Sequence, residues 1–231
     1  MITLAVDTSS KACSCALMRD GLLLGESYCN NGLTHSSTLM VLVENTLRAA
    51  NLPFESVDRL AVSVGPGSYT GLRIGLAAIK GMALVHNTPC VGVSTLLSLA
   101  YNVLPFEGVV CAALDARVGQ VFTALFSVKS GKVTRLTEDA AMTLDALGEH
   151  LPDGALICGD GAKLVCERFP EKGLRLAPAA LQYQRAASVA QAAISEDYPV
   201  VPATELMAEY HRKSQAERER EAKQQLEEEI E

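Results

Sequence analysis

Two aspartates in this sequence occupy positions where a carboxylate could do chemistry. Asp7 follows the apolar run Ile2–Val6 and opens the polar segment Asp7-Thr8-Ser9-Ser10, and Asp115 follows the apolar run Val109–Leu114. Carboxylates paired across a cleft suit magnesium and phosphate handling, or general-base catalysis. The alternative is that each aspartate caps its own turn through hydrogen bonds between its side chain and the backbone.

The segment Gly65-Pro66-Gly67-Ser68-Tyr69-Thr70-Gly71 is the most conspicuous local feature. It lies between an apolar run and a helical pattern, where backbone N–H groups and the positive end of a helix favour an anion. It is not a Walker A loop, because Leu72-Arg73 follows it in place of Lys-Ser or Lys-Thr. The alternative, which the spacing alone favours, is a tight turn in which Ser68 or Thr70 caps the helix.

No other residues form an obvious catalytic or metal-binding set. The four histidines (His35, His86, His150 and His211) do not pair with one another or with a cysteine at the spacing of zinc ligands. The seven cysteines are scattered and include no CxxC pair, which predicts reduced thiols rather than a disulfide framework. A G-x-S-x-G elbow is also absent from the sequence. We therefore expect no metal site and no catalytic residue in this chain.

The composition is that of an ordinary soluble domain. The 231 residues are 48% apolar and 20% charged, which allows one large domain or two lobes. The formal net charge of −7 makes the chain a poor candidate for holding nucleic acid by itself through phosphate neutralisation. No apolar run approaches the roughly 18 residues of a membrane span, and no signal-peptide pattern opens the chain. We expect a cytoplasmic protein without a membrane partner.

The order of the predicted elements in the first half of the chain is repeated in the second. Each half reads strand, aspartate, hairpin, helix, strand, Gly-x-Gly and helix, with Gly65-Pro66-Gly67 and Gly159-Asp160-Gly161 at matching points. A hairpin directly after the first strand gives a mixed sheet and excludes a Rossmann domain. We predict two similar α/β lobes with a cleft between them, over residues 1–104 and 105–204, and a charged helical tail over 205–231.

Two predicted helices of the first half carry apolar rows. The rows are Leu39, Leu42, Val43 and Leu47 in the first helix and Gly71, Gly75, Ala78 and Met82 in the second. A glycine inside a helix costs roughly 1 kcal/mol relative to alanine, so Gly75 and Gly81 require a reason. Close approach of another backbone would provide one, either from the protein's own sheet or from the helix of a partner.

Five motifs, in order along almost the whole chain, resemble those of the bacterial TsaB (YeaZ) family. They are Ile2-Thr3-Leu4-Ala5-Val6-Asp7-Thr8-Ser9, Gly65-Pro66-Gly67-Ser68-Tyr69-Thr70-Gly71-Leu72-Arg73-Ile74-Gly75, Gly92-Val93-Ser94-Thr95-Leu96, Asp115-Ala116-Arg117 and Tyr210-His211-Arg212-Lys213-Ser214-Gln215-Ala216-Glu217-Arg218. The resemblance implies the actin/Hsp70/sugar-kinase (RNase H-like) fold. It also implies a role in making N6-threonylcarbamoyladenosine (t6A) at position 37 of tRNA.

In that family the threonylcarbamoyl transfer is performed by the paralogue TsaD. The resemblance implies that this chain is the non-catalytic partner of TsaD, joined by the ATPase TsaE, and a homodimer when alone. The transferase's metal-binding His-x-x-x-His pair is missing, because Leu39 stands four positions after His35. The resemblance places ATP or ADP and magnesium only at the level of the complex, and tRNA contact only through the complex.

The family forms both dimers through the two helices of the first lobe. The candidate interface residues are therefore Leu39, Leu42, Val43, Leu47, Gly71, Leu72, Gly75, Leu76, Ala78, Ile79 and Met82. Asp7, Thr8, Ser9 and Asp115 match positions at which catalytic relatives contact nucleotide phosphates, and we interpret them as vestigial nucleotide loops.

Two rival functions remain open at this point. A small kinase or ATPase would use Asp7 and Asp115 with magnesium, and direct tRNA binding would require contacts that overcome the acidic charge. The partner hypothesis also predicts that Gly75→Leu leaves the monomer folded and abolishes the heterodimer.

Overall fold

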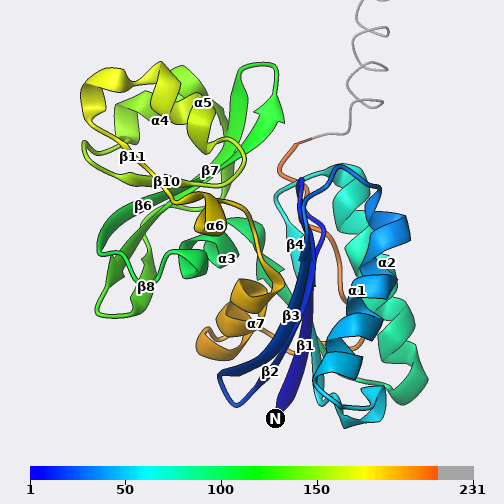
Figure 1. Ribbon diagram of the computed structural model, residues 1–231. Helices are drawn as coiled ribbons and strands as arrows, with labels where there is room; N and C mark the ends of the chain where they lie inside the picture. Colours follow the sequence, from blue (N-terminus) through cyan, green and yellow to red (C-terminus); the bar gives the residue numbers. More distant parts are fainter. Residues whose placement is uncertain (213–231) are drawn as a thin grey trace, which may run out of the picture.

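The computed structural model describes residues 1–212, which form two lobes, each built on a mixed sheet (Figure 1). The strand order is β3-β2-β1-β4-β5 in the first sheet and β11-β10-β6-β7-β8 in the second, where β9 also pairs with β7. In the first sheet β1 runs antiparallel to β2 and parallel to β4. In the second, β6 runs antiparallel to β7 and parallel to β10. The two sheets therefore repeat one plan, as the sequence predicted.

The first lobe contains the elements up to α3. They are β1 (Ile2–Asp7), β2 (Cys13–Arg19), β3 (Leu22–Cys29), α1 (His35–Ala49), the 3-10 helix η1 (Phe54–Ser56), β4 (Arg59–Gly65), α2 (Tyr69–His86), β5 (Cys90–Ser94) and α3 (Thr95–Asn102). Local sequence sets several of their ends. The β2–β3 hairpin turns at Asp20 and Gly21, both with positive φ, and α2 ends at Asn87 in the left-handed conformation.

The second lobe begins at β6. Its elements are β6 (Gly108–Arg117), β7 (Gln120–Lys129), β8 (Lys132–Arg135), β9 (Ala140–Thr143), α4 (Leu144–His150), β10 (Leu156–Cys158), α5 (Ala162–Arg168), the 3-10 helix η2 (Pro170–Lys172), β11 (Arg175–Leu176), α6 (Ala179–Gln182) and α7 (Ala186–Ser195). The strands β6, β7, β8 and β10 and the helices α4 and α5 agree with the predicted pattern. The elements β9, β11, α6 and α7 were not predicted from the sequence.

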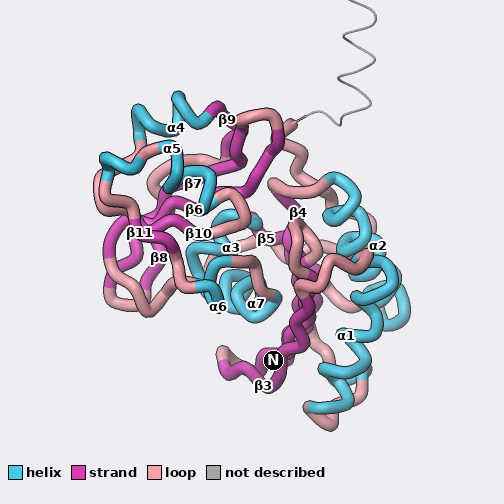
Figure 2. The backbone as a smooth tube through the Cα atoms, turned by 45° about the horizontal axis from the view of Figure 1, so that its top comes forward, coloured by secondary structure: helices cyan, strands magenta, loops and turns pink. Residues whose placement is uncertain are grey.

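Helices cover both faces of each sheet, so the central strands are buried on both sides. In β1, Leu4 and Val6 point to the core under α1 and α2, whereas Ala5 points to the core between the lobes. In β6, Ala112 faces that same central core and Cys111 faces the core under α4 and α5. Figure 2 shows α3 and α7 lying between the two sheets. This layering brings the carboxyl ends of the central strands of both lobes to one cleft.

Helix α7 belongs to the second half of the sequence but packs against the first sheet, mainly on β1 and β2. Two polar residues of that sheet hold its start. The backbone N–H of Ala186 donates to Ser14 Oγ (2.9 Å), and Glu26 accepts from the Ala187 N–H (3.1 Å) and from Arg185 Nε (3.0 Å). The chain thus returns to the first lobe within the range 105–204, and the predicted boundary at residue 104 stays a prediction.

The last described residues, 206–212, form no helix and run along the first lobe toward the cleft. The predicted helical tail over 205–231 falls largely on residues 213–231, which lie outside the described residues. No helix in residues 1–212 is long and apolar enough to span a membrane.

Glu26 provides the first test of this architecture. We expect Glu26→Ala to lower the free energy of unfolding by about 2–3 kcal/mol, because it removes charge-assisted hydrogen bonds from a carboxylate that is only 6% exposed. Urea denaturation measures the change. The matched control is Glu44→Ala, which breaks an exposed pair with Arg48 and should change stability by less than about 0.5 kcal/mol. Equal effects of the two substitutions would contradict the docking role of Glu26.

Candidate functional site

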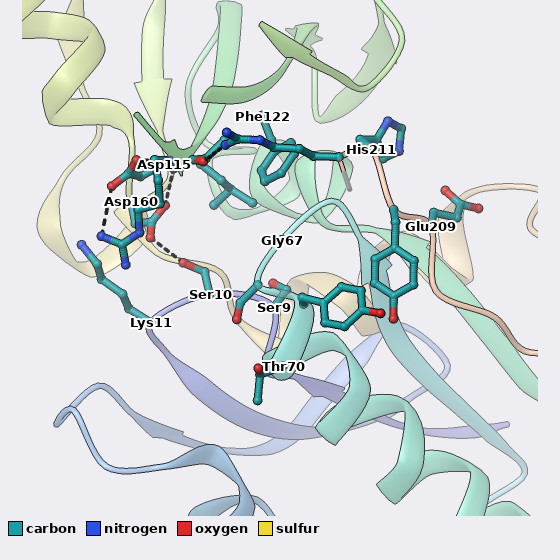
Figure 3. Close-up of a pocket in the computed structure, with 17 residues that line it drawn as sticks. Ser9, Ser10, Lys11, Gly67, Thr70, Asp115, Phe122, Asp160, Glu209 and His211 are labelled. Carbon is teal, nitrogen blue, oxygen red and sulfur yellow. Dashed lines mark hydrogen bonds and ion pairs between the residues drawn. The ribbon is translucent and has the colours of Figure 1, made fainter. Parts of the chain in front are cut away.

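A cleft of about 610 Å³ lies between the lobes, at the ends of β1, β4, β6 and β10 (Figure 3). Residues from both lobes and from the last described segment line it. They are Ser9, Ser10, Lys11, Gly67, Ser68, Tyr69, Thr70, Leu114, Asp115, Ala116, Arg117, Phe122, Asp160, Glu209, Tyr210, His211 and Arg212. Of the four residues assigned to vestigial nucleotide loops, Ser9 and Asp115 line the cleft, whereas Asp7 and Thr8 lie behind it.

Asp7 is fully buried and its carboxylate is engaged by neighbouring residues. Oδ1 accepts from Ser9 N (2.9 Å) and Ser9 Oγ (2.7 Å), and Oδ2 accepts from Ser63 Oγ. Burial raises the pKa of the Asp7 carboxyl, and the hydrogen bonds from Ser63 and Ser9 offset only part of that rise. Asp7 therefore fixes the loop that follows β1.

Asp115 faces the cleft but is also tied to its own turn. Its Oδ1 accepts from Arg117 N (2.8 Å), and its Oδ2 lies 3.7 Å from Arg117 Nη1. In both lobes the backbone N–H two residues after the aspartate donates a hydrogen bond to the aspartate Oδ1. The donor is Ser9 N for Asp7 and Arg117 N for Asp115. The turn-capping alternative therefore describes both aspartates, and the two carboxylates do not face each other across the cleft.

Asp160 is a carboxylate that joins the two lobes, and it was not among the predicted site residues. Its Oδ2 accepts from Ser10 Oγ of the first lobe (2.6 Å), and its Oδ1 accepts from Asp115 N of the second (2.9 Å; Figure 3). The only signal in the sequence was its place between Gly159 and Gly161. The close packing of both glycines on β6 requires that pattern: a Cβ at Gly159 would overlap the carbonyl oxygen of Ala113, and one at Gly161 would lie 3.0 Å from Asp115 N.

The glycine-rich segment is packed against the loop after β1. A Cβ at Gly67 would overlap the Ser9 carbonyl oxygen, and one at Gly71 would overlap that of Thr8. The Thr8 hydroxyl donates to the Gly71 carbonyl (2.7 Å), and Ser68 Oγ accepts from Gly71 N (3.2 Å). The predicted capping role of Ser68 is confirmed.

Gly75 faces the interior of its own lobe. A Cβ there would lie 2.5 Å from Thr8 Oγ1 and 3.3 Å from Val62 Cγ2. The protein's own sheet, rather than a partner helix, therefore explains this glycine. A leucine at this position would displace the loop after β1, so we now expect Gly75→Leu to destabilise the monomer itself. Gly81 is different: no atom lies within 4 Å of its Cβ position.

Most of the predicted interface residues build the core beneath α1 and α2. Those that are buried in the monomer are Leu39, Leu42, Val43, Gly71, Leu72, Gly75, Leu76 and Ile79, and those that are half-buried are Leu47, Ala78 and Met82. The outward sides of the same helices carry a different apolar set. It consists of the exposed Met40, Val41, Ala77, Gly81, Leu84 and Val85 and the half-buried Ile74, and we call it the outer face.

Residues 209–212 form one wall of the cleft, and the sequence did not predict their place there. Glu209 N donates to the Val64 carbonyl (2.8 Å), and the Tyr210 ring lies 4.6 Å from that of Tyr69. Arg73 Nε donates to the Tyr210 hydroxyl (3.1 Å), and Arg212 donates to the Ala116 carbonyl of the second lobe. This segment therefore spans from β4 to β6.

Residues 1–212 contain no group of three or more His, Cys, Asp or Glu side chains placed to hold a metal ion. His35 Nε2 donates to the Ser10 carbonyl (2.7 Å), so this imidazole supports the loop that lines the cleft. A magnesium ion between Asp7 and Asp115 does not fit, because Asp7 is sealed by three hydrogen bonds and Asp115 is paired with Arg117.

Comparison with known proteins now adds to this geometry. The family model described as TsaD, tRNA N6-adenosine threonylcarbamoyltransferase, matches residues 32–214. The chain belongs to this family. It is 34% identical over 144 residues to the tRNA threonylcarbamoyladenosine biosynthesis protein TsaB of Bacillus subtilis, covering 62% of this chain and 63% of that protein. It is 37% identical over 127 residues to TsaB of Escherichia coli, covering 54% of each.

The structure of YeaZ from Pseudomonas aeruginosa is similar over a longer span. It superposes with a TM-score of 0.78 at 25% identity, covering 90% of this chain and 99% of that one. The chain spans about three fifths of the length of the Bacillus subtilis protein and about half of the length of the Escherichia coli protein. The resemblance to TsaB (YeaZ) proteins is confirmed, and the two lobes with mixed sheets agree with the fold predicted from it.

The buried Asp7 predicts a pH dependence of stability. Since its pKa in the folded state lies above the ordinary value of 3.8, the folded state binds the proton more tightly than the unfolded state. Its contribution to the free energy of unfolding therefore falls as the pH rises from about 4 through the raised pKa. Asp7→Asn removes this decline, so urea denaturation between pH 4.5 and 7.5 should give a flatter profile than that of the parent. The exposed Asp153→Asn is the control, and an Asp7→Asn profile parallel to the parent's would contradict the assignment.

Proposed function

We propose that the chain is a non-catalytic subunit in the synthesis of tRNA threonylcarbamoyladenosine. It would bind and activate the transferase TsaD, join TsaE in the same assembly, and form a homodimer when alone. Its relatives named as TsaB biosynthesis proteins support the process. The similarity to the transferase family supports a pair of paralogues with related folds, this chain and TsaD, in which TsaD performs the chemistry.

The observation that carries this proposal is the outer face of α1 and α2. Leu84 and Val85 are 67% and 66% exposed, and Met40 and Val41 are about half exposed. Small residues lie between the larger ones along α2, where Gly81 has open space and would let another helix approach closely. An apolar helical face of this kind is typical of protein–protein contact.

The cleft supports a role without chemistry of its own. Its two candidate phosphate-loop aspartates are held within their own turns, so ATP or ADP with magnesium would be bound only at the level of the complex. The net charge of −7 favours tRNA contact through the partner rather than by this chain. The cytoplasm, where tRNA is modified, is the proposed location.

Gly81 gives the decisive test, by light scattering on a sizing column with the TsaD paralogue from the same genome. We expect Gly81→Arg to keep the monomer folded and to weaken the heterodimer about a hundredfold, because a charged side chain would be buried between helices. Gly81→Ala is the matched control. It should stabilise the monomer by about 0.5–1 kcal/mol, because alanine favours helix over glycine.

Gly75→Leu separates folding from association in the same helix. We expect it to destabilise the isolated chain by about 2 kcal/mol or more, since Thr8 and Val62 occupy the space. An intact heterodimer with Gly81→Arg would refute the outer face as the contact surface. ATP turnover by the isolated chain that disappears with Asp115→Ala would instead support the kinase-like alternative.

A further inference from the structure

Two hydrogen-bond donors that line the cleft are occupied by one carboxylate of the chain itself, and cationic side chains line the same cleft. The donors are Ser10 Oγ and Asp115 N, both bonded to Asp160, and the side chains of Lys11 and Arg117 line the same space (Figure 3). A hydroxyl, a backbone N–H and nearby cations are the groups that bind a phosphate-type anion. Here the hydroxyl and the backbone N–H are bonded to a carboxylate of the chain instead.

We propose that Asp160 is an autoinhibitory latch, whose carboxylate occupies the anion-binding position of the cleft and excludes phosphate-type anions from it. This inference goes beyond the proposed function, since it concerns the isolated chain and needs no partner. It also follows from the poor fit of a magnesium nucleotide, because the same loops that would hold phosphates are closed by hydrogen bonds within the chain.

The latch is effective because its loop is held rigidly. Gly159 N donates to the Gln182 carbonyl (2.6 Å), and Gly161 N donates to the Ala113 carbonyl (3.0 Å). Gly159 adopts φ +102° and has no room for a side chain. The Asp160 carboxylate, which lies between these two glycines, therefore meets its donors with little further loss of conformational entropy. An anion that binds from solution must also lose translational and rotational entropy.

The latch also ties the lobes together. Ser10 lies 150 residues before Asp160 and belongs to the first lobe, whereas Asp115 is in β6 of the second. A second link between the lobes runs from Ser94 Oγ to Asp139 Oδ2 (2.5 Å), and neither residue lines the cleft. This second link provides a control that loosens the lobes without freeing the donors.

The test is isothermal titration calorimetry of inorganic pyrophosphate into the isolated full chain and its variants, without magnesium. We expect Asp160→Ala to bind pyrophosphate at least about tenfold more tightly than the parent, since it frees both donors and removes a negative charge. Asp160→Asn should show a smaller gain, because its amide keeps hydrogen-bonding capacity at the same place. Asp139→Asn should bind no better than the parent, and Glu209→Gln should gain less than about threefold.

Several outcomes would overturn the proposal. One is a folded Asp160→Ala that binds pyrophosphate no better than the parent. Another is an equal gain from Glu209→Gln, which would mean that the net charge of the cleft decides, and a third is an equal gain from Asp139→Asn, which would mean that loosening the lobes decides. If thermal melting shows that Asp160→Ala does not fold, the affinity of Asp160→Asn for pyrophosphate becomes the test. Its gain over the parent must then exceed the gain of Glu209→Gln. None of these results depends on TsaD binding, so they leave the proposed function to its own test.

Discussion

The close approach between the loop after β1 and the start of α2 is the constraint on which the rest of the structure depends. Three glycines make it possible, because any side chain at Gly67, Gly71 or Gly75 would meet atoms of Thr8 or Ser9. The contact is closed by hydrogen bonds from Thr8 Oγ1 to the Gly71 carbonyl and from Ser68 N to the Ser9 carbonyl (2.7 Å each). It fixes how α2 lies on the sheet and which of its sides faces solvent.

Both candidate surfaces of the molecule follow from that one contact. With Gly71 and Gly75 turned inward, the side of α2 that carries Gly81 and Leu84 must turn outward. The same contact holds Ser9 and Ser10 at the entrance of the cleft. The two surfaces lie on different sides of the helix, so a partner could cover one while the cleft stays as it is.

Local and periodic features of the sequence predicted much of this fold. The repeated order of elements, the Ser68 cap and the matching positions of Asp7 and Asp115 could all be inferred from neighbouring residues. Helix α7 (Ala186–Ser195) was not identified; its buried residues are mostly alanines, and it packs between the lobes. The Asp160 bridge and the wall formed by 209–212 depend on contacts between distant segments, which no local spacing encodes.

The inward orientation of Gly75 shows why the sequence could not choose between its two explanations. A glycine row at helical spacing indicates close packing, but it does not say against what. Here the decision rests on Thr8 and Val62, which come from two other segments of the chain. Gly81, on another side of the same helix, has open space around its Cβ position and is the glycine that a partner helix could approach.

Several acidic residues serve as hydrogen-bond acceptors inside the protein, among them Asp7, which first suggested chemistry. Asp7 holds the loop after β1, Glu26 holds the start of α7, Asp139 links to Ser94 and Asp160 links the lobes. Carboxylates whose oxygens are engaged by hydroxyl and amide donors have little capacity left for a metal ion or for a proton in transfer. A chain that uses its acids to fix its loops has a rigid surface, and rigidity lowers the entropic cost of any binding to that surface.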